Sequence, residues 1–445
     1  MKRNARLNVF DCTMIVVSLV IGMGIFRTPA NVAKAVPDTA TFFLAWIAGG
    51  IVALCGALTY AEIGSRLPVT GGYYRVFSYA YHPSIAFAIN CIILVSNAAS
   101  LGAVALIGSE YISGVLFPAI QDGQALQVRQ VAIAIGSILI FYGVNLLGLK
   151  MSSRAQNVLT VIKISLVVLL ITPLFFVHHG PGPVPLVRHL PASWPEYLTG
   201  FGTGFFAVSF TYGGYQQTIN FGAEVSNPGR NIPRAIFLGI AIIILLYLTI
   251  NYAYIKVIGL DGLRNSRGIA SAMAAHVFGE QAGRVLSIFL FLSVLAYVNV
   301  LLLSNPRVMY AMSEDGVLPS AFGKKIGSHD VLFNSLTAFT AVCVIVVFWA
   351  KAFDEILGFT IFLDCFGMAA SAGSIFILRR KKVQPEGEQI YRMKLYPLMP
   401  LIFILAYGYV AITIFIGRPG TAYTALAVLA FFLIIYFASH SRRKA

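Results

Sequence analysis

The sequence predicts an all-α integral membrane protein with twelve transmembrane helices, on three observations. Of its 445 residues, 58% are hydrophobic and only 11% are charged, whereas soluble domains carry about 25% charged residues. The apolar residues lie in long runs rather than one-sided stripes, and the chain can hold about a dozen spans of about 20 residues each. Glycines interrupt two of these runs. We expect one transmembrane domain over residues 1–445 and no separate soluble domain.

The expected spans follow the apolar runs along the chain. Their ranges are 9–35, 42–64, 84–116, 128–148, 155–177, 196–224, 233–257, 282–312, 331–350, 355–379, 396–416 and 421–440. The first span is interrupted at Gly22-Met23-Gly24 and the sixth at Gly213-Gly214. An interrupted helix in lipid frees backbone N–H and C=O groups that a continuous helix satisfies itself. Each interruption is therefore a candidate ligand site.

The two interrupted spans each begin a set of five. Residues 9–177 hold the first five spans and residues 196–379 the next five. Because five is odd, the second set enters the membrane from the opposite side. This arrangement is typical of the inverted repeat of secondary transporters, in which broken helices from both halves hold the substrate. The two spans in 396–440 lie outside it. The alternative is that the glycines only permit a kink or close helix packing.

The placement of charge indicates the orientation in the membrane. The net charge is +15, and most of the Lys and Arg residues lie in alternate loops that include both chain ends. The positive-inside rule places these loops and both termini in the cytoplasm, in a cell (inner or plasma) membrane. The charge is thereby explained without nucleic acid. The five cysteines are isolated, and we find no metal-ligand spacing, nucleotide-binding motif or catalytic triad. We expect no cofactor, no metal and no enzyme activity.

The backbone at the two interruptions suits a zwitterion. The N–H groups of Met23 and Gly24 begin a new half-helix, whose positive end favours a carboxylate. Carbonyl groups at both interruptions favour an ammonium, so an α-amino acid would fit without charged side chains. The candidate substrate-binding residues are Val20, Ile21, Gly22, Met23, Gly24, Phe210, Thr211, Tyr212, Gly213 and Tyr215.

Three segments resemble one family in the same order along the chain. They are Ile21-Gly22-Met23-Gly24-Ile25-Phe26, Tyr212-Gly213-Gly214-Tyr215 with the following 224–236, and the segment 305–319. They resemble the amino acid–polyamine–organocation (APC) superfamily, and more narrowly bacterial relatives of the L-type amino acid transporters. The resemblance implies the leucine-transporter-like fold with a 5+5 inverted repeat. It also implies that Phe210 forms an aromatic gate, that Tyr215 replaces the family's usual Trp, and that Met23 replaces a frequent Ser.

Lys163 is a charged residue deep within the fifth span. Intramembrane charges are costly, about 2.5–3.5 kcal/mol on insertion scales, and are functional by default. By the resemblance, Lys163 lies where sodium-coupled cousins hold a Na⁺ ion, and its ammonium would brace the first break against the eighth span. A buried amine that can lose its proton would permit proton coupling. The alternative is a permanent charge that only pins the helices together.

Arg27 and Asp364 are two further charges within expected spans. Arg27 lies one turn beyond the first break, and Asp364 lies in the tenth span. A distant cousin, the bacterial leucine transporter, has an Arg–Asp pair at a similar place, which suggests that these residues form an external gate. The alternative is two separately solvated charges. Glu62, Arg66 and Glu110 lie near span ends and are expected to form structural pairs.

The sequence therefore predicts a secondary active transporter of amino acids, working by alternating access as an exchanger or a proton symporter. Neutral L-amino acids are favoured because no charged side chain is expected in the pocket itself. A transporter of another organic cation, a polyamine or a nucleobase is the alternative, and an ion channel is a third possibility. The expected partners are the small-molecule substrate and the lipid bilayer. Because the loop 117–128 holds no cysteine, we expect no disulfide-linked accessory subunit.

Overall fold

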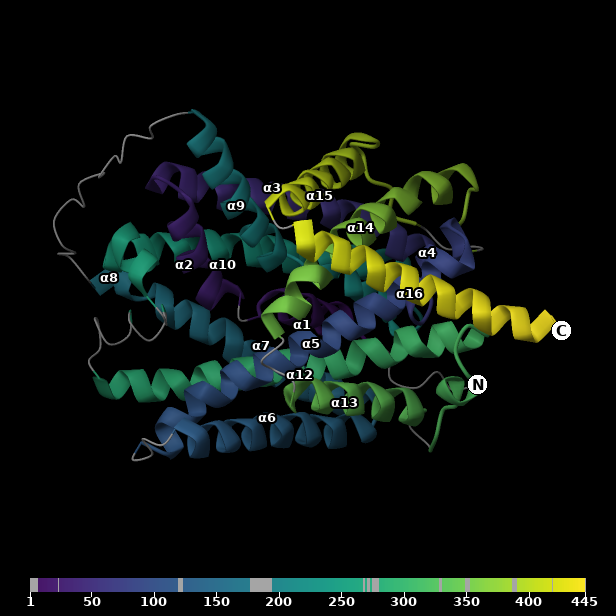
Figure 1. Cartoon of the computed structure of the whole chain (residues 1–445), viewed down its shortest axis with the longest axis horizontal. Coiled ribbons are helices and arrows are strands. Elements are labelled where there is room, and N and C mark those ends of the chain that lie inside the picture. The colour runs from purple at the N-terminus through teal and green to yellow at the C-terminus, as the bar shows by residue number, and fades with distance from the viewer. Residues whose placement is uncertain are drawn as a thin grey trace.

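The computed structural model is a bundle of long helices, most of which run along the longest axis of the molecule (Figure 1). It describes residues 7–22, 24–118, 123–176, 194–266, 269, 273, 280–327, 330–348, 353–385, 390–417 and 419–444. The short helix α4 and both chain ends lie at one end of the bundle, which we call the α4 end. Helices α2, α8 and α9 lie toward the other end, the α2 end.

The long helices agree with the expected spans to within three residues at most ends; the larger differences, of five to eight residues, are at the fourth, fifth and seventh spans, and the sixth span differs most. The long helices are α1 (Val9–Val20), α2 (Gly24–Ala35), α3 (Thr39–Arg66), α5 (Pro83–Leu116), α6 (Gly123–Leu146), α7 (Leu149–Ile171), α9 (Trp194–Thr211), α10 (Pro228–Asn265), α12 (Glu280–Glu314), α13 (Phe333–Phe348), α14 (Phe353–Arg380), α15 (Leu398–Gly417) and α16 (Pro419–Lys444). Their agreement with the apolar runs follows from the need of each helix to hold its backbone polar groups out of lipid.

Nine helices in the described part of the chain, with α1 and α2 counted together, are long and apolar enough to cross a membrane. Two shorter apolar helices, Phe333–Phe348 and Ala422–Ala438, fall at the expected ninth and twelfth spans. Helix α9, at the expected sixth span, is not among either group. The chain is thus an all-helical integral membrane protein as far as the structure describes it.

Both expected breaks are present. Helix α1 ends at Val20 and α2 begins at Gly24. Helix α9 ends at Thr211, and Gly214 then adopts a φ of 113°, a backbone conformation that favours glycine. The second break differs from expectation, because no α-helix follows it within 212–224. The chain continues as two 3₁₀ turns, η1 (Tyr215–Asn220) and η2 (Gly222–Glu224).

The broken helices lie at the centre of the bundle. Helix α1 packs against α7, α10 and α12, and α2 packs against α9 and α10. Helix α14 packs against both α5 and α15, and α15 packs against α3. One element was not predicted: α4 (Gly72–Ala80) is a short helix in the loop between α3 and α5. Helix α8 (Pro173–Phe176), which follows α7, is a single turn of four residues.

Candidate functional site

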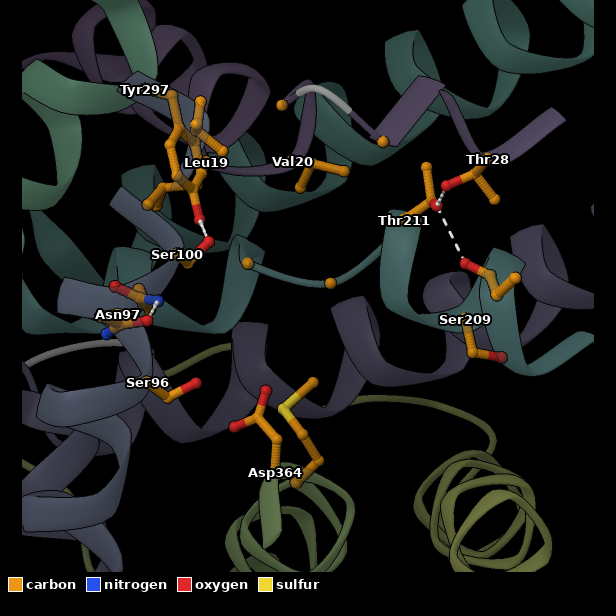
Figure 2. A pocket seen from close by; sticks show the side chains of 18 of the residues that line it. Leu19, Val20, Thr28, Ser96, Asn97, Ser100, Ser209, Thr211, Tyr297 and Asp364 are labelled. Carbon is orange, nitrogen blue, oxygen red and sulfur yellow. Dashed lines mark hydrogen bonds between the residues drawn. The ribbon is translucent and has the colours of Figure 1, made fainter. Parts of the chain in front are cut away.

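A central cavity of about 430 Å³ lies between the two breaks (Figure 2). Its volume falls within the range of about 300–1,000 Å³ that small-molecule sites occupy. Val20, Gly22 and Gly24 line it from the first break, and Thr211 and Gly213 from the second. The structure therefore brings together five of the candidate substrate-binding residues from segments far apart in the sequence.

The cavity extends from the breaks toward the α2 end. On α2 its lining residues are Gly24, Arg27, Thr28 and Asn31, whose spacing marks one face of a helix. On α5 the lining continues from Ser96 to Ile107. Arg27 is exposed. On α1 the lining begins only at Leu19, so the cavity reaches farther along α2 and α5 toward the α2 end than along α1 toward the α4 end.

The carbonyls at the end of α1, which were expected to receive an ammonium, already accept hydrogen bonds within the protein. The Ile21 carbonyl accepts a hydrogen bond from the Lys163 ammonium, and Ile21 is fully buried outside the cavity lining. The Val20 carbonyl accepts from the Tyr247 hydroxyl at 3.1 Å and from the Gly22 N–H at 2.7 Å. Side chains from α7 and α10 thus already donate to these carbonyls, and their part in binding an ammonium stays a prediction.

The start of α2 keeps its suitability for a carboxylate. Gly24 is the first residue of the helix and lines the cavity, and the leading N–H groups of a helix have no partner within it. The Thr211 and Thr28 hydroxyls are joined by a 2.9 Å hydrogen bond beside this start (Figure 2). Met23 lies outside the described residues. Phe210 belongs to the last turn of α9, but its side chain is also outside the description.

Tyr212 and Tyr215 do not line the cavity, although both were candidates. Tyr212 is buried against Trp46 and Tyr247, with ring centroids 6.0 and 5.0 Å away. Tyr215 is buried against Tyr60, at 6.0 Å. Both rings lie outside the cavity because they fill gaps between helices, where burial of their apolar area stabilises the fold.

Gly214 should not tolerate a side chain. A Cβ atom there would overlap the Leu19 carbonyl oxygen, and the φ of 113° is unfavourable for other residues. We expect Gly214→Ala to lower the free energy of unfolding by at least about 1–3 kcal/mol. The control is Gly22→Ala, whose added Cβ would meet Tyr297 only at 3.7 Å. Thermal unfolding of the purified proteins tests this, and equal stability of the two variants would contradict the described second break.

Lys163 is fully buried beside the first break. Besides the Ile21 carbonyl, its ammonium donates to the Ser18 hydroxyl at 3.3 Å and to the Ser18 carbonyl at 3.4 Å. The Ser18 hydroxyl in turn donates to the Ala296 carbonyl of α12 at 3.3 Å. The ammonium therefore braces α1 against α7 and, through Ser18, against α12. Whether it takes part in coupling stays a prediction.

Arg27 and Asp364 both line the cavity, but they do not form an ion pair in the described structure. Arg27 interacts electrostatically with Glu110 on α5 instead. The premise that no charged side chain lies in the pocket was wrong. Asp364 belongs to α14, and the folding of α14 across the breaks brings its carboxylate to the cavity.

Sequence reasoning missed a group of polar side chains on α5 and α12. Ser96, Asn97 and Ser100 line the cavity from α5, and the Ser100 hydroxyl is 2.8 Å from the Tyr297 hydroxyl of α12 (Figure 2). Asn97 Nδ2 donates to Asn305 Oδ1 at 2.7 Å. A signal was present: three polar residues at one face of an apolar span are costly in lipid and mark an interior surface.

Comparison with known proteins decides the family. The model of the family described as "Amino acid permease" matches residues 7–438. The chain belongs to this family. The permease is 27% identical over 398 residues to the serine/threonine exchanger SteT of Bacillus subtilis, covering 88% of this chain and 86% of that protein. It is 24% identical over 426 residues to the human large neutral amino acids transporter small subunit 2, covering 95% and 78%. It is 25% identical over 450 residues to the methylthioribose transporter of Bacillus subtilis, covering 97% and 92%.

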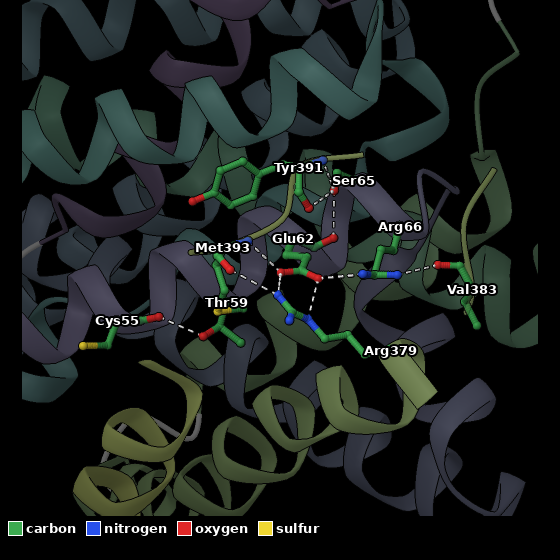
Figure 3. A network of polar contacts seen from close by, with 9 residues as sticks. All are labelled: Cys55, Thr59, Glu62, Ser65, Arg66, Arg379, Val383, Tyr391 and Met393. Carbon is green, nitrogen blue, oxygen red and sulfur yellow. Dashed lines mark hydrogen bonds and ion pairs between the residues drawn. The ribbon is translucent and has the colours of Figure 1, made fainter. Parts of the chain in front are cut away.

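A buried polar network joins several segments near the α4 end of the permease. Glu62 on α3 is fully buried and pairs with Arg66 at 2.8 Å and with Arg379 of α14 at 2.6 Å (Figure 3). It also accepts the Met393 N–H at 2.9 Å. The expected Glu62–Arg66 pair is thus present, and α14 supplies a partner that was not predicted. This network ties together α3, α14 and the segment that leads to α15.

A second set of contacts joins the segment before α1 to the segment that follows the second break. The Arg307 guanidinium of α12 pairs with Glu224 of η2 at 2.7 Å. The Leu7 N–H donates to the Glu224 carbonyl at 2.8 Å, and the Leu7 carbonyl accepts from the Ser226 N–H at 2.9 Å. The start of α1 and the chain after η2 are therefore joined directly. None of these residues, nor those of the Glu62 network, lines the central cavity.

Proposed function

We propose that this permease moves amino acids across the membrane by alternating access, as an exchanger or a proton symporter. The observation that carries the proposal is a substrate-sized cavity that both broken segments border and that reaches farther toward the α2 end than toward the α4 end. A channel would need an aqueous path to both ends, whereas an alternating carrier needs a closed end in each state. In this proposal, the Glu62 and Arg307 contacts hold one end closed in the present conformation.

The proposed architecture has twelve spans, of which ten form two inverted repeats. Residues 9–177 are the first repeat, 196–379 the second, and 396–440 the two remaining spans. The meeting of the two breaks at one cavity supports this division, because inverted repeats place their broken helices at a shared site. The positive-inside rule supports an α4 end in the cytoplasm, with both termini there. The cavity then faces outward in this conformation.

Neutral L-amino acids are the proposed main substrates. Two of the relatives above are named for amino acids, and the match to the serine/threonine exchanger covers most of this chain. The start of α2 would receive the carboxylate, because backbone N–H groups at a helix start favour an anion. The methylthioribose transporter supports a second candidate, a different small polar substrate in the same cavity.

The alternating step would open the α4 end by moving α1 away from its neighbours. Lys163 bears on this step because it holds the carbonyls and hydroxyl at the end of α1. A substrate in the cavity would contact Gly24 and Thr211 from the two breaks at once. We propose that this shared contact links substrate binding to the movement of the two segments.

Counterflow in proteoliposomes tests the proposal. Vesicles loaded with an unlabelled amino acid should accumulate external labelled amino acid transiently and saturably, with alanine, serine and leucine competing. An imposed pH gradient that drives accumulation in unloaded vesicles would identify a proton symporter, and its absence an exchanger. Folded protein that shows no counterflow with any amino acid would contradict the proposal, and uptake that does not saturate would indicate a channel.

A further inference from the structure

Asp364 is a carboxylate on the wall of the central cavity. Among the described residues that line the cavity it is the one acidic side chain, and Arg27 is the one basic side chain. Figure 2 shows the Asp364 side chain projecting from its helix toward the space below the breaks, with Ser96 of α5 on one side.

This carboxylate has no cation beside it in the described structure. No ion pair or hydrogen bond joins Asp364 to another described side chain. Four tyrosines lie near enough to interact electrostatically with the Asp364 carboxylate: Tyr60, Tyr73, Tyr297 and Tyr407. The Tyr297 hydroxyl is bonded to Ser100 and the Tyr60 hydroxyl to Ser371. A carboxylate at membrane depth without a partner is costly, so such groups mark binding sites or ion paths.

Arg27 does not neutralise Asp364. Both side chains reach the cavity, yet they are too far apart for an ion pair, and Arg27 interacts with Glu110. Arg27 is also exposed toward the α2 end, whereas Asp364 is half-buried. A gate pair that closes over the substrate would need a different conformation from the one described.

At the first break, the backbone carbonyl groups that could accept hydrogen bonds from a substrate ammonium are already in use. A bound amino acid brings an ammonium that needs acceptors, and the carbonyls of Val20 and Ile21 already accept from Tyr247 and Lys163. These two carbonyls are therefore partly used, and a further acceptor on the cavity wall would strengthen the binding of an ammonium. Asp364 offers two carboxylate oxygens, and charge-assisted hydrogen bonds to ammonium groups are stronger than neutral ones.

We propose that Asp364 binds an ammonium group of the substrate and so makes the cavity selective for amines. The inference rests on the proposed function, because the ligand is a substrate of the same cavity. The ammonium has two sources: the α-ammonium that every amino acid carries, or a second ammonium on a side chain such as that of lysine. The carboxylate chemistry is the same for both, and the choice of ligand separates them.

The test compares Asp364→Asn with Glu110→Gln in ligand binding and in counterflow. Asparagine keeps the shape of the side chain and removes its charge, and Glu110 is an exposed carboxylate outside the cavity lining. Binding of alanine, lysine and putrescine is measured by ligand-induced thermal stabilisation of purified protein. If the α-ammonium is the source, Asp364→Asn should weaken both alanine and lysine about tenfold or more. If a side-chain ammonium is the source, it should weaken lysine by that factor and leave alanine unchanged.

Unchanged affinity of Asp364→Asn for alanine and lysine would overturn the proposal. A slower transport rate with unchanged affinity would also overturn it, because that result is expected of a gate residue. Should Asp364→Asn not fold, Asp364→Ser replaces it. Failure of the proposed function would look different: wild-type protein would show no amino acid counterflow. Putrescine binding that is lost in Asp364→Asn would then still support an amine site, and its retention would overturn it.

Discussion

Replacing Glu62 with glutamine should lower the free energy of unfolding by about 3–5 kcal/mol, the usual result of removing one member of a buried ion pair. Glu62 is fully buried, Arg66 is 5% exposed, and Arg379 is 23% exposed. Both guanidinium groups would lose their only carboxylate among the described contacts. Arg379 would still lie over the Tyr396 ring, at 3.7 Å, which cannot replace a full negative charge.

Glu314→Gln is the matched control for this experiment. Glu314 pairs with Arg75 at 2.8 Å, but the two side chains are 44% and 26% exposed, so the change should cost less than about 1 kcal/mol. Thermal or denaturant unfolding in detergent, followed by circular dichroism, measures both variants. Similar unfolding of Glu62→Gln and Glu314→Gln would show that the Glu62 network does not hold the α4 end together.

Lys163→Met should reduce transport about 100-fold, because a misplacement of about 1 Å at a reacting or binding centre can cost that factor. Methionine keeps much of the length of the side chain and removes the ammonium. The Ile21 carbonyl and the Ser18 hydroxyl then lose their donor, and an unsatisfied buried polar group costs about 1–3 kcal/mol. The variant no longer buries a charge, which raises the free energy of unfolding. Because the two effects oppose each other, stability should change less than transport.

Lys150→Met provides the comparison on the same helix. Lys150 is exposed near the start of α7, so its loss should leave the breaks undisturbed. Initial rates of counterflow at several substrate concentrations measure both variants, with unfolding temperature recorded on the same samples. A Lys163→Met protein that transports like Lys150→Met would reduce Lys163 to a packing residue.

The sequence predicted the helices well because lipid imposes a simple rule. Apolar runs of the right length must be helical, so α5 begins and ends within one residue of expectation. Both breaks were located by their glycines. The 3₁₀ turns after Gly214 were not predictable, because they depend on contacts such as that of the Gln216 side chain, which accepts the Gly214 N–H at 2.9 Å.

The contents of the cavity were harder to predict than its place. Hydropathy does not say which way a ring points, so Tyr215 was placed at the site although it packs on Tyr60. Nor does it say which distant charges meet: the pairing of Arg379 with Glu62 was not predicted. Asp364 was recognised as costly, but only the three-dimensional packing of α14 shows that its carboxylate borders the same cavity as the breaks.

The most direct test of the account is a structure, by electron cryo-microscopy, of the permease saturated with an amino acid that supports counterflow. The account predicts ligand density between the two breaks, in contact with Gly24 and Thr211. It also predicts α1 ending near Val20 and α9 ending near Thr211, as they do here. Ligand bound elsewhere, or a continuous helix through either glycine segment, would contradict it.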